Sequence, residues 1–250
     1  FPADNLSLTL AIILYFNLRR EWRAVENTSQ DQKYKIGLLL SLIIFILNFV
    51  GLLLTFSRSA WLGVAAGFIG LLVYYFINER KLFLISFKFV AIMAITAVLF
   101  VVLFPGLILG RLSIEGRLET KSIAERTAYN QEAWQIIKQH WLFGVGVRNY
   151  GLGVYNEIND NKPAYAYQPA HNVFLLIWAE TGILGLVSFL VFLLSCFLTL
   201  WRRKNFEIMA VLVAIVGVMC FDHWVWSLAF GMYLFWFILG VSFKKESSII

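Results

Sequence analysis

The sequence is dominated by long runs of apolar residues that few charges interrupt. Two of the clearest runs extend from Leu82 to Phe104 and from Val173 to Leu200. A helix needs about 20 mainly apolar residues to cross the hydrocarbon core of a bilayer, and both runs meet that length. They are too continuously apolar to be the alternating strands of a membrane barrel. The sequence therefore predicts an integral membrane protein built from transmembrane helices.

The composition of the chain supports this class. Hydrophobic residues make up 60% of the 250 residues and charged residues only 14%, with a mean hydropathy of +0.75. A water-soluble domain of this size does not sustain that balance. We predict an all-α, polytopic helix bundle of about seven spans, at residues 6–18, 36–56, 60–77, 82–104, 173–200, 206–221 and 225–241. Residues 1–106 then hold four spans, residues 107–171 a large outer loop, and residues 172–250 three spans.

Basic residues orient the predicted bundle. They gather in alternate short connections, at Arg19, Arg20, Arg23, Lys33, Lys35, Arg80, Lys81, Lys88, Arg202, Arg203, Lys204, Lys244 and Lys245. Short cytoplasmic loops of membrane proteins carry an excess of Lys and Arg. The N-terminus is therefore expected outside and the C-terminus inside. This topology places all three histidines, His140, His171 and His223, on the outer side.

The outer loop is expected to contain one amphipathic helix. No Gly or Pro occurs between Glu119 and His140. At helical spacing one face carries Tyr129, Ala133, Ile136, Ile137 and His140. We expect this helix to lie on, or dip into, the outer membrane surface.

Glycines suggest two further structural features. Gly144 and Gly146 follow the amphipathic helix in a short turn. Such a turn can aim several N–H groups at one phosphate, although two glycines alone are a weak signal. Gly63, Gly67 and Gly70 lie in the third predicted span, where small residues typically allow close helix packing.

His171 is the strongest candidate for a catalytic residue on local sequence evidence. It immediately precedes Asn172, a good N-cap for the fifth span. The positive end of the helix dipole disfavours an imidazolium, so we expect His171 to be neutral near pH 7 and able to accept a proton. The alternative is an interfacial histidine that only hydrogen-bonds the loop.

Two arginines are candidate anion-binding residues. Arg58 lies between two apolar runs with only serines as polar neighbours, where a guanidinium is costly unless it faces a partner or a cavity. Arg126 shares a helix face with Tyr129, which could aim it inward. Together with a neutral histidine, two arginines suit a diphosphate leaving group and a general base. The alternatives are contacts with lipid headgroups or with solvent.

Three more polar residues are candidate supporting groups. Glu180 lies nine residues beyond His171. That spacing puts the two on roughly opposite helix faces, so Glu180 should face another helix and not orient the histidine. Asp222 and His223 sit at an outer helix tip, either as part of an aromatic belt or as a contribution to an outer cavity. A zinc site made from Asp222, His223, His171 and His140 is possible, but no pair has ligand spacing on one helix.

Several motifs carry a resemblance to a known family. The string His171-Asn172-x-Phe174-Leu175, followed by Glu180-x-Gly182-x-x-Gly185, resembles the signature of the O-antigen ligase and polymerase superfamily. These bacterial enzymes use undecaprenyl-diphosphate-linked glycans. Other similar pieces occur in the same order: Ser57-Arg58-Ser59, Glu125-Arg126, Phe143-Gly144-Val145-Gly146 and Asp222-His223-x-x-Trp226.

The resemblance implies a lipid-linked glycosyltransferase of the bacterial inner membrane with its site on the outer side. It assigns diphosphate binding to Arg58 and Arg126, and activation of an acceptor hydroxyl to His171, in an inverting attack. Asn172, Glu180, Asp222 and His223 would support the site. The acceptor would be a glycan, a lipid or a protein; no cofactor, metal or nucleic acid is expected. Family members usually have more N-terminal helices, so the chain is expected to be a C-terminal portion.

A transporter or flippase for a polyprenyl-linked glycan is the main alternative. Such a protein would also place arginines in an outer membrane cavity. It would, however, be expected to contain internal repeats and ionisable residues along a path across the membrane. The sequence has no evident repeat, and the predicted spans hold few charges. A ligase and a polymerase are not separated by these motifs, because the same outer chemistry serves both.

Overall fold

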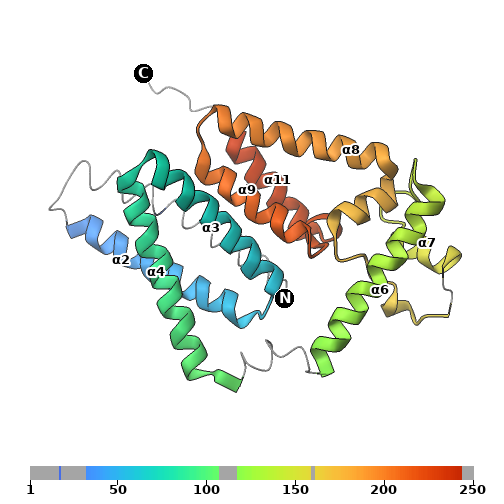
Figure 1. The fold of residues 1–250 in the computed structure, drawn as a ribbon, viewed down its shortest axis with the longest axis horizontal. Coiled ribbons are helices and arrows are strands. Elements are labelled where there is room, and N and C mark those ends of the chain that lie inside the picture. Colours follow the sequence, from blue (N-terminus) through green and yellow to red (C-terminus); the bar gives the residue numbers. More distant parts are fainter. Residues whose placement is uncertain (1–16, 18–31, 107–116, 159–160, 244–250) are drawn as a thin grey trace. The chain divides into compact units, whose positions relative to one another are not determined.

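The computed structural model describes residues 17, 32–106, 117–158 and 161–243 (Figure 1). Within these residues the elements are helical and no strand occurs, which confirms the predicted all-α class. The main helices are α2 (Gln32–Leu54), α3 (Arg58–Asn78), α4 (Arg80–Leu103), α6 (Arg117–His140), α7 (Tyr150–Glu157), α8 (Val173–Arg202), α9 (Phe206–Met219), α10 (Trp224–Ser227) and α11 (Ala229–Phe243). A short 3-10 turn, η1, covers Ala164–Ala166. The first predicted span, apart from residue 17, lies outside the described residues.

Three of the described helices are long and apolar enough to cross a membrane: α3, α4 and α8. Shorter apolar helices occur at Leu39–Leu54 within α2, at α9, and at Ala229–Gly240 within α11. The structure therefore contains membrane-spanning candidates at several predicted positions. The total of seven spans stays a prediction.

The helix ends follow local signals in some places and tertiary contacts in others. Helix α4 ends at Leu103, just before Pro105, as the proline predicts. The last predicted span, at residues 225–241, is wrong as one continuous helix, because extended backbone at Leu228 separates α10 from α11. A β-carbon on Gly231 would lie 2.3 Å from the carbonyl oxygen of Trp224, so the missing side chain lets α11 approach α10 closely.

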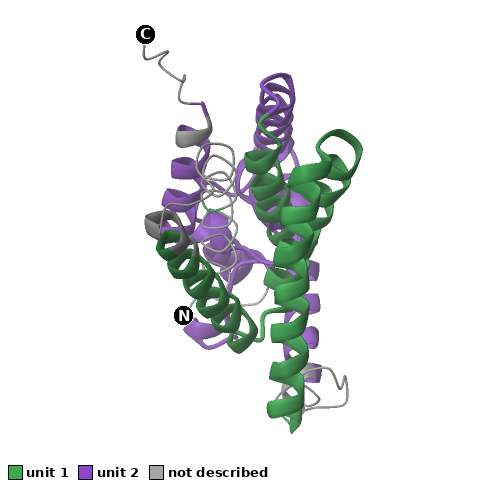
Figure 2. Cartoon of the chain, turned by 90° about the vertical axis from the view of Figure 1, so that its left-hand side faces the viewer, with its two compact units in different colours: residues 1–114, 205–218 green, residues 115–204, 219–250 purple. Residues whose placement is uncertain are grey.

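The chain divides into two compact units (Figure 2). Residues 1–114 and 205–218 form unit 1, and residues 115–204 and 219–250 form unit 2. The first unit contains α2, α3, α4 and most of α9. The second contains most of the predicted outer loop, with α6 and α7, and α8, α10 and α11.

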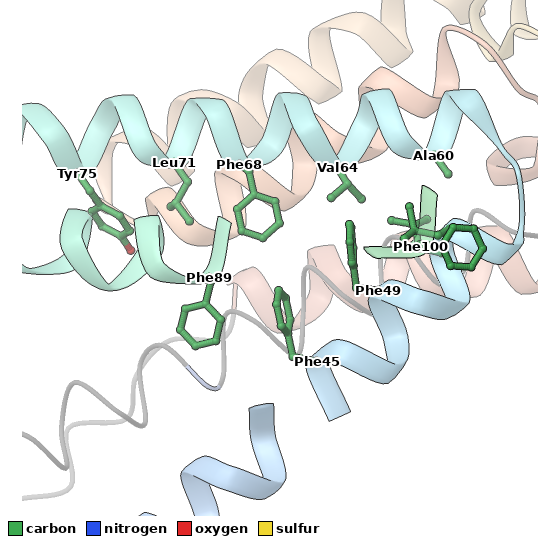
Figure 3. Close-up of a cluster of buried hydrophobic side chains, with 11 residues drawn as sticks. Phe45, Phe49, Ala60, Val64, Phe68, Leu71, Tyr75, Phe89 and Phe100 are labelled. Atoms are coloured by element: carbon green, nitrogen blue, oxygen red, sulfur yellow. The ribbon is translucent and has the colours of Figure 1, made fainter. Parts of the chain in front are cut away.

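The core of unit 1 is a cluster of aromatic and aliphatic side chains between α2, α3 and α4 (Figure 3). Phe45 of α2 is fully buried and meets Phe89 of α4 edge to ring, with ring centroids 5.3 Å apart. Val64 and Phe68 of α3 cover the same region. Aromatic contacts of this kind stabilise helix packing where lipid removes the usual hydrophobic driving force between helices.

Close packing of α3 on α9 depends on Gly63 and Gly67, two of the three glycines predicted to allow helix packing. A β-carbon at Gly63 would lie 2.8 Å from the carbonyl oxygen of Ala214, and one at Gly67 would lie 2.9 Å from that of Ala210. The predicted packing role is therefore confirmed for these two. It is wrong for Gly70, where an added β-carbon would meet nothing within 4 Å among the described residues.

In unit 2, helix α6 packs on α7 and α8. Its predicted apolar face is buried, since Ala133 and Ile136 are 0% exposed and Ile137 is 3% exposed. These side chains form one cluster with residues of α7 and α8 such as Leu176. The buried face was predicted correctly, but its contact was not. Protein side chains pack against this face of α6, whereas the prediction placed the helix on the membrane surface.

Substitution of the packing glycines tests the α3–α9 contact. Gly63→Ala should lower the free energy of unfolding by about 1–3 kcal/mol, because the new methyl group would force the two backbones apart. Thermal unfolding of the purified protein in detergent measures the change. Gly70→Ala on the same helix is the matched control and should leave the melting temperature unchanged or higher. Equal melting temperatures for the two variants would contradict the close packing.

Candidate functional site

Helix α8 is two helical segments joined by a kink at Gly182, which has φ 70° and ψ −176°. Figure 1 shows the ribbon changing direction near this end of α8. The predicted uninterrupted span at residues 173–200 is therefore wrong at one point. A kink frees backbone groups that must find other partners. Here the turn after α6 supplies them: the N–H of Val145 donates to Ala179 O and that of Ile183 donates to Trp141 O, each over 2.9 Å.

Gly144 of this turn and Gly182 of α8 are both needed for the close approach of the turn to α8. A β-carbon at Gly144 would lie 2.4 Å from the carbonyl carbon of Glu180, and one at Gly182 would lie 2.0 Å from the carbonyl oxygen of Leu142. The N–H of Gly146 donates to Glu180 O over 2.9 Å and that of Gly144 to His140 O over 2.8 Å. The suggestion that this turn aims free N–H groups at a phosphate is therefore wrong for these two residues.

Glu180 points to another helix, as the helix geometry predicted. Its side chain is buried, with the residue 4% exposed. The indole Nε1–H of Trp226 in α10 donates to Glu180 Oε2 over 2.8 Å. This bond joins the first segment of α8 to α10, the helix that directly follows Asp222 and His223.

Asn172 caps α8, as predicted from its position. Its Oδ1 accepts hydrogen bonds from the N–H groups of Phe174 over 2.9 Å and Leu175 over 3.1 Å. Its Nδ2 donates to the carbonyl oxygen of Cys220 over 3.1 Å. The same side chain therefore holds the start of α8 and the segment that leads to Asp222.

These connections bring His171, Asp222 and His223 together. His171 Nδ1 lies 3.4 Å from Asp222 Oδ1, which is a close polar contact and not a well-formed hydrogen bond. This buried nitrogen has no hydrogen-bond partner among the described residues. The rings of His171 and His223 meet edge to face, with centroids 4.8 Å apart. Asp222 Oδ1 also accepts from the backbone N–H of His223 over 2.8 Å.

The charge states of the cluster follow from burial and from its neighbours. Burial raises the pKa of Asp222, but the polar contact with His171 and the N–H of His223 outweigh it, so the pKa of this carboxyl is lowered. Burial lowers the pKa of His223; the charge of Asp222 opposes this, while His171 and Arg126 add to it. Near pH 7, Asp222 is therefore an anion and His223 a neutral imidazole. Half-buried Arg126 of α6 lies within electrostatic range of the cluster.

Two features beside the cluster were not found from the sequence. The ring of Tyr129 stacks beside that of His171, with centroids 6.1 Å apart. Lys162 forms an ion pair with Glu132 of α6 and places its Nζ 5.8 Å from the Tyr129 ring centroid and 5.9 Å from that of Tyr167. No spacing rule joins a lysine in a loop to a glutamate thirty positions earlier, so only the fold reveals this contact.

A comparison with family models shows the family of the chain. The model described as O-antigen ligase matches residues 40–190. The chain belongs to this family. A comparison with curated proteins finds no significant match. The family and the apolar helices together identify an integral membrane protein of the O-antigen ligase family, whose members are associated with glycan transfer.

The region that matches the O-antigen ligase family contains Arg58, Arg126 and His171, whereas Asp222 and His223 follow it. Arg58 is the exposed first residue of α3 in unit 1, directly after the N-cap Ser57, whose side chain accepts from Ala60 N–H. Helix α3 thus begins at the arginine of the Ser57-Arg58-Ser59 motif.

The same cluster has the donor types of a metal site. One ligand atom each from His171, Asp222 and His223 lie within 4.8 Å of one another. Imidazole and carboxylate are ordinary zinc ligands. His140, the fourth residue weighed for zinc, instead pairs its Nε2 with Glu157 over 2.7 Å. The three-residue cluster suits either of two roles. It could hold a proton acceptor with an orienting carboxylate, or it could bind a metal ion.

The kink in α8 predicts the effect of replacing its glycine. Gly182→Ala should lose the site geometry, because the backbone conformation there is essentially restricted to glycine and costs other residues about 1–3 kcal/mol. The added methyl group would also clash with the Leu142 carbonyl. Hydrogen exchange should then speed up at the amides of Val145 and Gly146. Gly240→Ala in α11 is the control, because an added β-carbon there would meet nothing within 4 Å in the described part of the chain. Unchanged exchange in Gly182→Ala would show that the turn does not depend on the kink.

Proposed function

We propose that this protein transfers a glycan from a polyprenyl-diphosphate donor to an acceptor hydroxyl, with His171 as the general base. The observation that carries the proposal is the contact of the His171 imidazole with the anionic Asp222, beside the charge of Arg126. Membership of the O-antigen ligase family supports a reaction of this class. The donor is proposed to be undecaprenyl diphosphate carrying a glycan.

The cluster explains which nitrogen of His171 would act. A carboxylate beside Nδ1 favours the tautomer with its proton on that nitrogen, which leaves the lone pair of Nε2 available. Nε2 would take the proton of the acceptor hydroxyl as its oxygen attacks the anomeric carbon. The bond from that carbon to the diphosphate oxygen breaks, the electron pair leaves with the diphosphate, and the configuration at the carbon inverts. Asp222 would stabilise the imidazolium that forms.

Arginine side chains would hold the diphosphate. A guanidinium offers several N–H donors in a planar fork and stays charged, which suits the negative charge that grows on the leaving group. This role of Arg126 is supported by its electrostatic effect on the pKa of His223. The same role is proposed for Arg58 on the resemblance of its motif alone.

The remaining polar residues are proposed to support the site. Asn172 would fix the backbone beside His171 through its two-sided hydrogen bonding, and Glu180 would fix α10 through Trp226. His223, held by a 2.5 Å contact between its Nδ1 and Ser227 Oγ, would keep the neighbouring ring in place. No cofactor is part of the scheme.

The proposed topology assigns the site to one side of the membrane. We propose seven spans with the N-terminus outside, so that residues 107–171 form an outer loop between residues 1–106 and 172–250. The cluster would then face the outer side of the bacterial inner membrane, where the lipid-linked donor is used.

Replacement of the base tests the proposal directly. His171→Ala should reduce glycan transfer by about 10²–10⁴-fold, the usual contribution of a positioned general base. Transfer is measured in cells that lack the chromosomal gene and carry the variant gene in full, with membrane abundance followed by immunoblot. His140→Ala removes a histidine that pairs with Glu157 and should retain most of the activity.

Two outcomes would contradict the assigned role of His171. Normal transfer by His171→Ala at normal abundance would exclude a general base at this position. Loss of activity in a metal chelator, with recovery on adding zinc, would assign the three residues to a metal ion instead. The proposed chemistry predicts that a chelator leaves the rate of transfer unchanged.

Arginine-to-lysine changes test diphosphate binding. Arg126→Lys and Arg58→Lys keep the charge but remove the planar fork, so donor turnover should fall at least about tenfold. Arg148→Lys, at an exposed position in the turn after α6, is the matched control. Donor turnover by Arg126→Lys equal to that of Arg148→Lys would remove Arg126 from the proposed site, and the same comparison applies to Arg58.

The glycan that changes on gene deletion identifies the acceptor class. Accumulation of unligated polymer indicates a ligase, whereas accumulation of single repeat units indicates a polymerase. Loss of transport with intact transfer in isolated membranes would favour the flippase alternative, because a flippase needs no base.

A further inference from the structure

The kink at Gly182 divides α8 into parts of different character. The segment after it, from Ile183 to Arg202, has about 20 residues and a length of about 30 Å, enough to cross a bilayer alone. It ends at Arg202, Arg203 and Lys204, a basic group typical of the cytoplasmic interface. Counted from that end, the outer interface falls at the kink. The first segment of α8 is then not needed to cross the hydrocarbon.

The segment after the kink exposes a continuous apolar surface. Its exposed side chains include Leu184, Val187, Leu190, Val191 and Leu194. No described protein element covers them, and lipid is the environment that suits such a surface on a spanning helix. At the end nearest the kink, this surface begins at Leu184, two residues after Gly182.

The turn after α6 continues the same apolar surface. Trp141 is 56% exposed and Phe143 is 73% exposed. The hydrogen bond from Ile183 N–H to Trp141 O places this turn at the start of the spanning segment. Two exposed basic residues, Lys138 and Arg148, flank it in the sequence. Aromatic rings beside basic side chains are typical of the layer where acyl chains meet phosphate headgroups.

We propose that the turn formed by Trp141, Leu142 and Phe143 inserts into the outer interfacial layer of the lipid bilayer and anchors the outer loop there. The anchor rests on the exposed rings, the kink and the span length, and it does not depend on the proposed function. Where that function holds, the anchor sets the height of His171 relative to the headgroup layer in which a lipid-linked diphosphate lies.

Spin labels on two matched aromatic positions test the anchor. Phe143 and Tyr165 are both highly exposed, at 73% and 79%. Phe143 lies in the turn that contacts α8 at Gly182, whereas Tyr165 belongs to the separate turn η1. The free cysteines Cys196 and Cys220 are first replaced by serine. Phe143→Cys and Tyr165→Cys are then labelled in the full chain, in vesicles of phosphatidylethanolamine and phosphatidylglycerol. Collisions with oxygen and with a water-soluble nickel complex are compared.

The label at position 143 should collide more with oxygen than with nickel, and the label at 165 should show the reverse order. Equal nickel accessibility at both positions would overturn the proposal and leave the turn in water, where exposed rings instead suit a glycan or a protein partner. Trp141→Phe gives a second measurement without a label. In vesicles that contain brominated lipid, wild-type tryptophan fluorescence should be quenched by a larger fraction than that of the variant. Equal quenched fractions would likewise overturn the anchor.

Discussion

The backbone groups released by the kink in α8 set the main constraint on this structure. Inside a membrane each unpaired N–H or C=O costs several kcal/mol, so a broken helix is tolerated only where protein groups replace the lost bonds. The turn that follows α6 provides that replacement for Ala179, Glu180 and Ile183. The outer loop and α8 must therefore fold together. His171, Asp222 and His223 all lie directly before α8 or α10, and Glu180 of α8 holds α10 in place.

The polar residues of unit 2 illustrate how an apolar protein keeps ionisable groups. Asp222 remains charged because His171 and a backbone N–H interact with it, and His223 remains neutral because burial lowers its pKa and the charge of Arg126 adds to that effect. The carboxylate of Glu180 receives the indole N–H of Trp226. In each case a specific partner offsets the cost of burial. The one exception in the cluster is Nδ1 of His171, which lacks a full hydrogen bond among the described residues.

The sequence predicted the features that depend on neighbouring residues. The cap by Asn172, the end of α4 before Pro105 and the buried face of α6 all follow from rules that act within a few positions. The direction of Glu180 follows from the 100° step of a helix. Periodicity shows which face of α6 is buried but not what packs against it. The prediction that this helix lies on the membrane surface was therefore wrong for the face that packs on α7 and α8.

The features that the sequence did not predict depend on contacts between distant segments. Gly182 was visible in the sequence, but its partners lie about forty residues earlier in the chain. The break at Leu228 has no proline or glycine of its own, and it accompanies a close approach of Gly231 to Trp224. The segments that carry His171 and Asp222 are also joined by the hydrogen bond from Asn172 to Cys220. Resemblance to a family suggested these residues together, and the fold supplies the distances.

The ion pair of Lys162 with Glu132 has a consequence for the entropy of the site. Residues between Lys162 and His171 form an irregular connection, and such a segment would ordinarily sample many conformations. Lys162 fixes one end to α6 between the rings of Tyr129 and Tyr167, while the cap at Asn172 fixes the other. The conformational freedom of this connection is therefore lost when the protein folds, before any substrate arrives. A substrate then meets an imidazole that is already positioned, and its binding energy need not be used to order the loop.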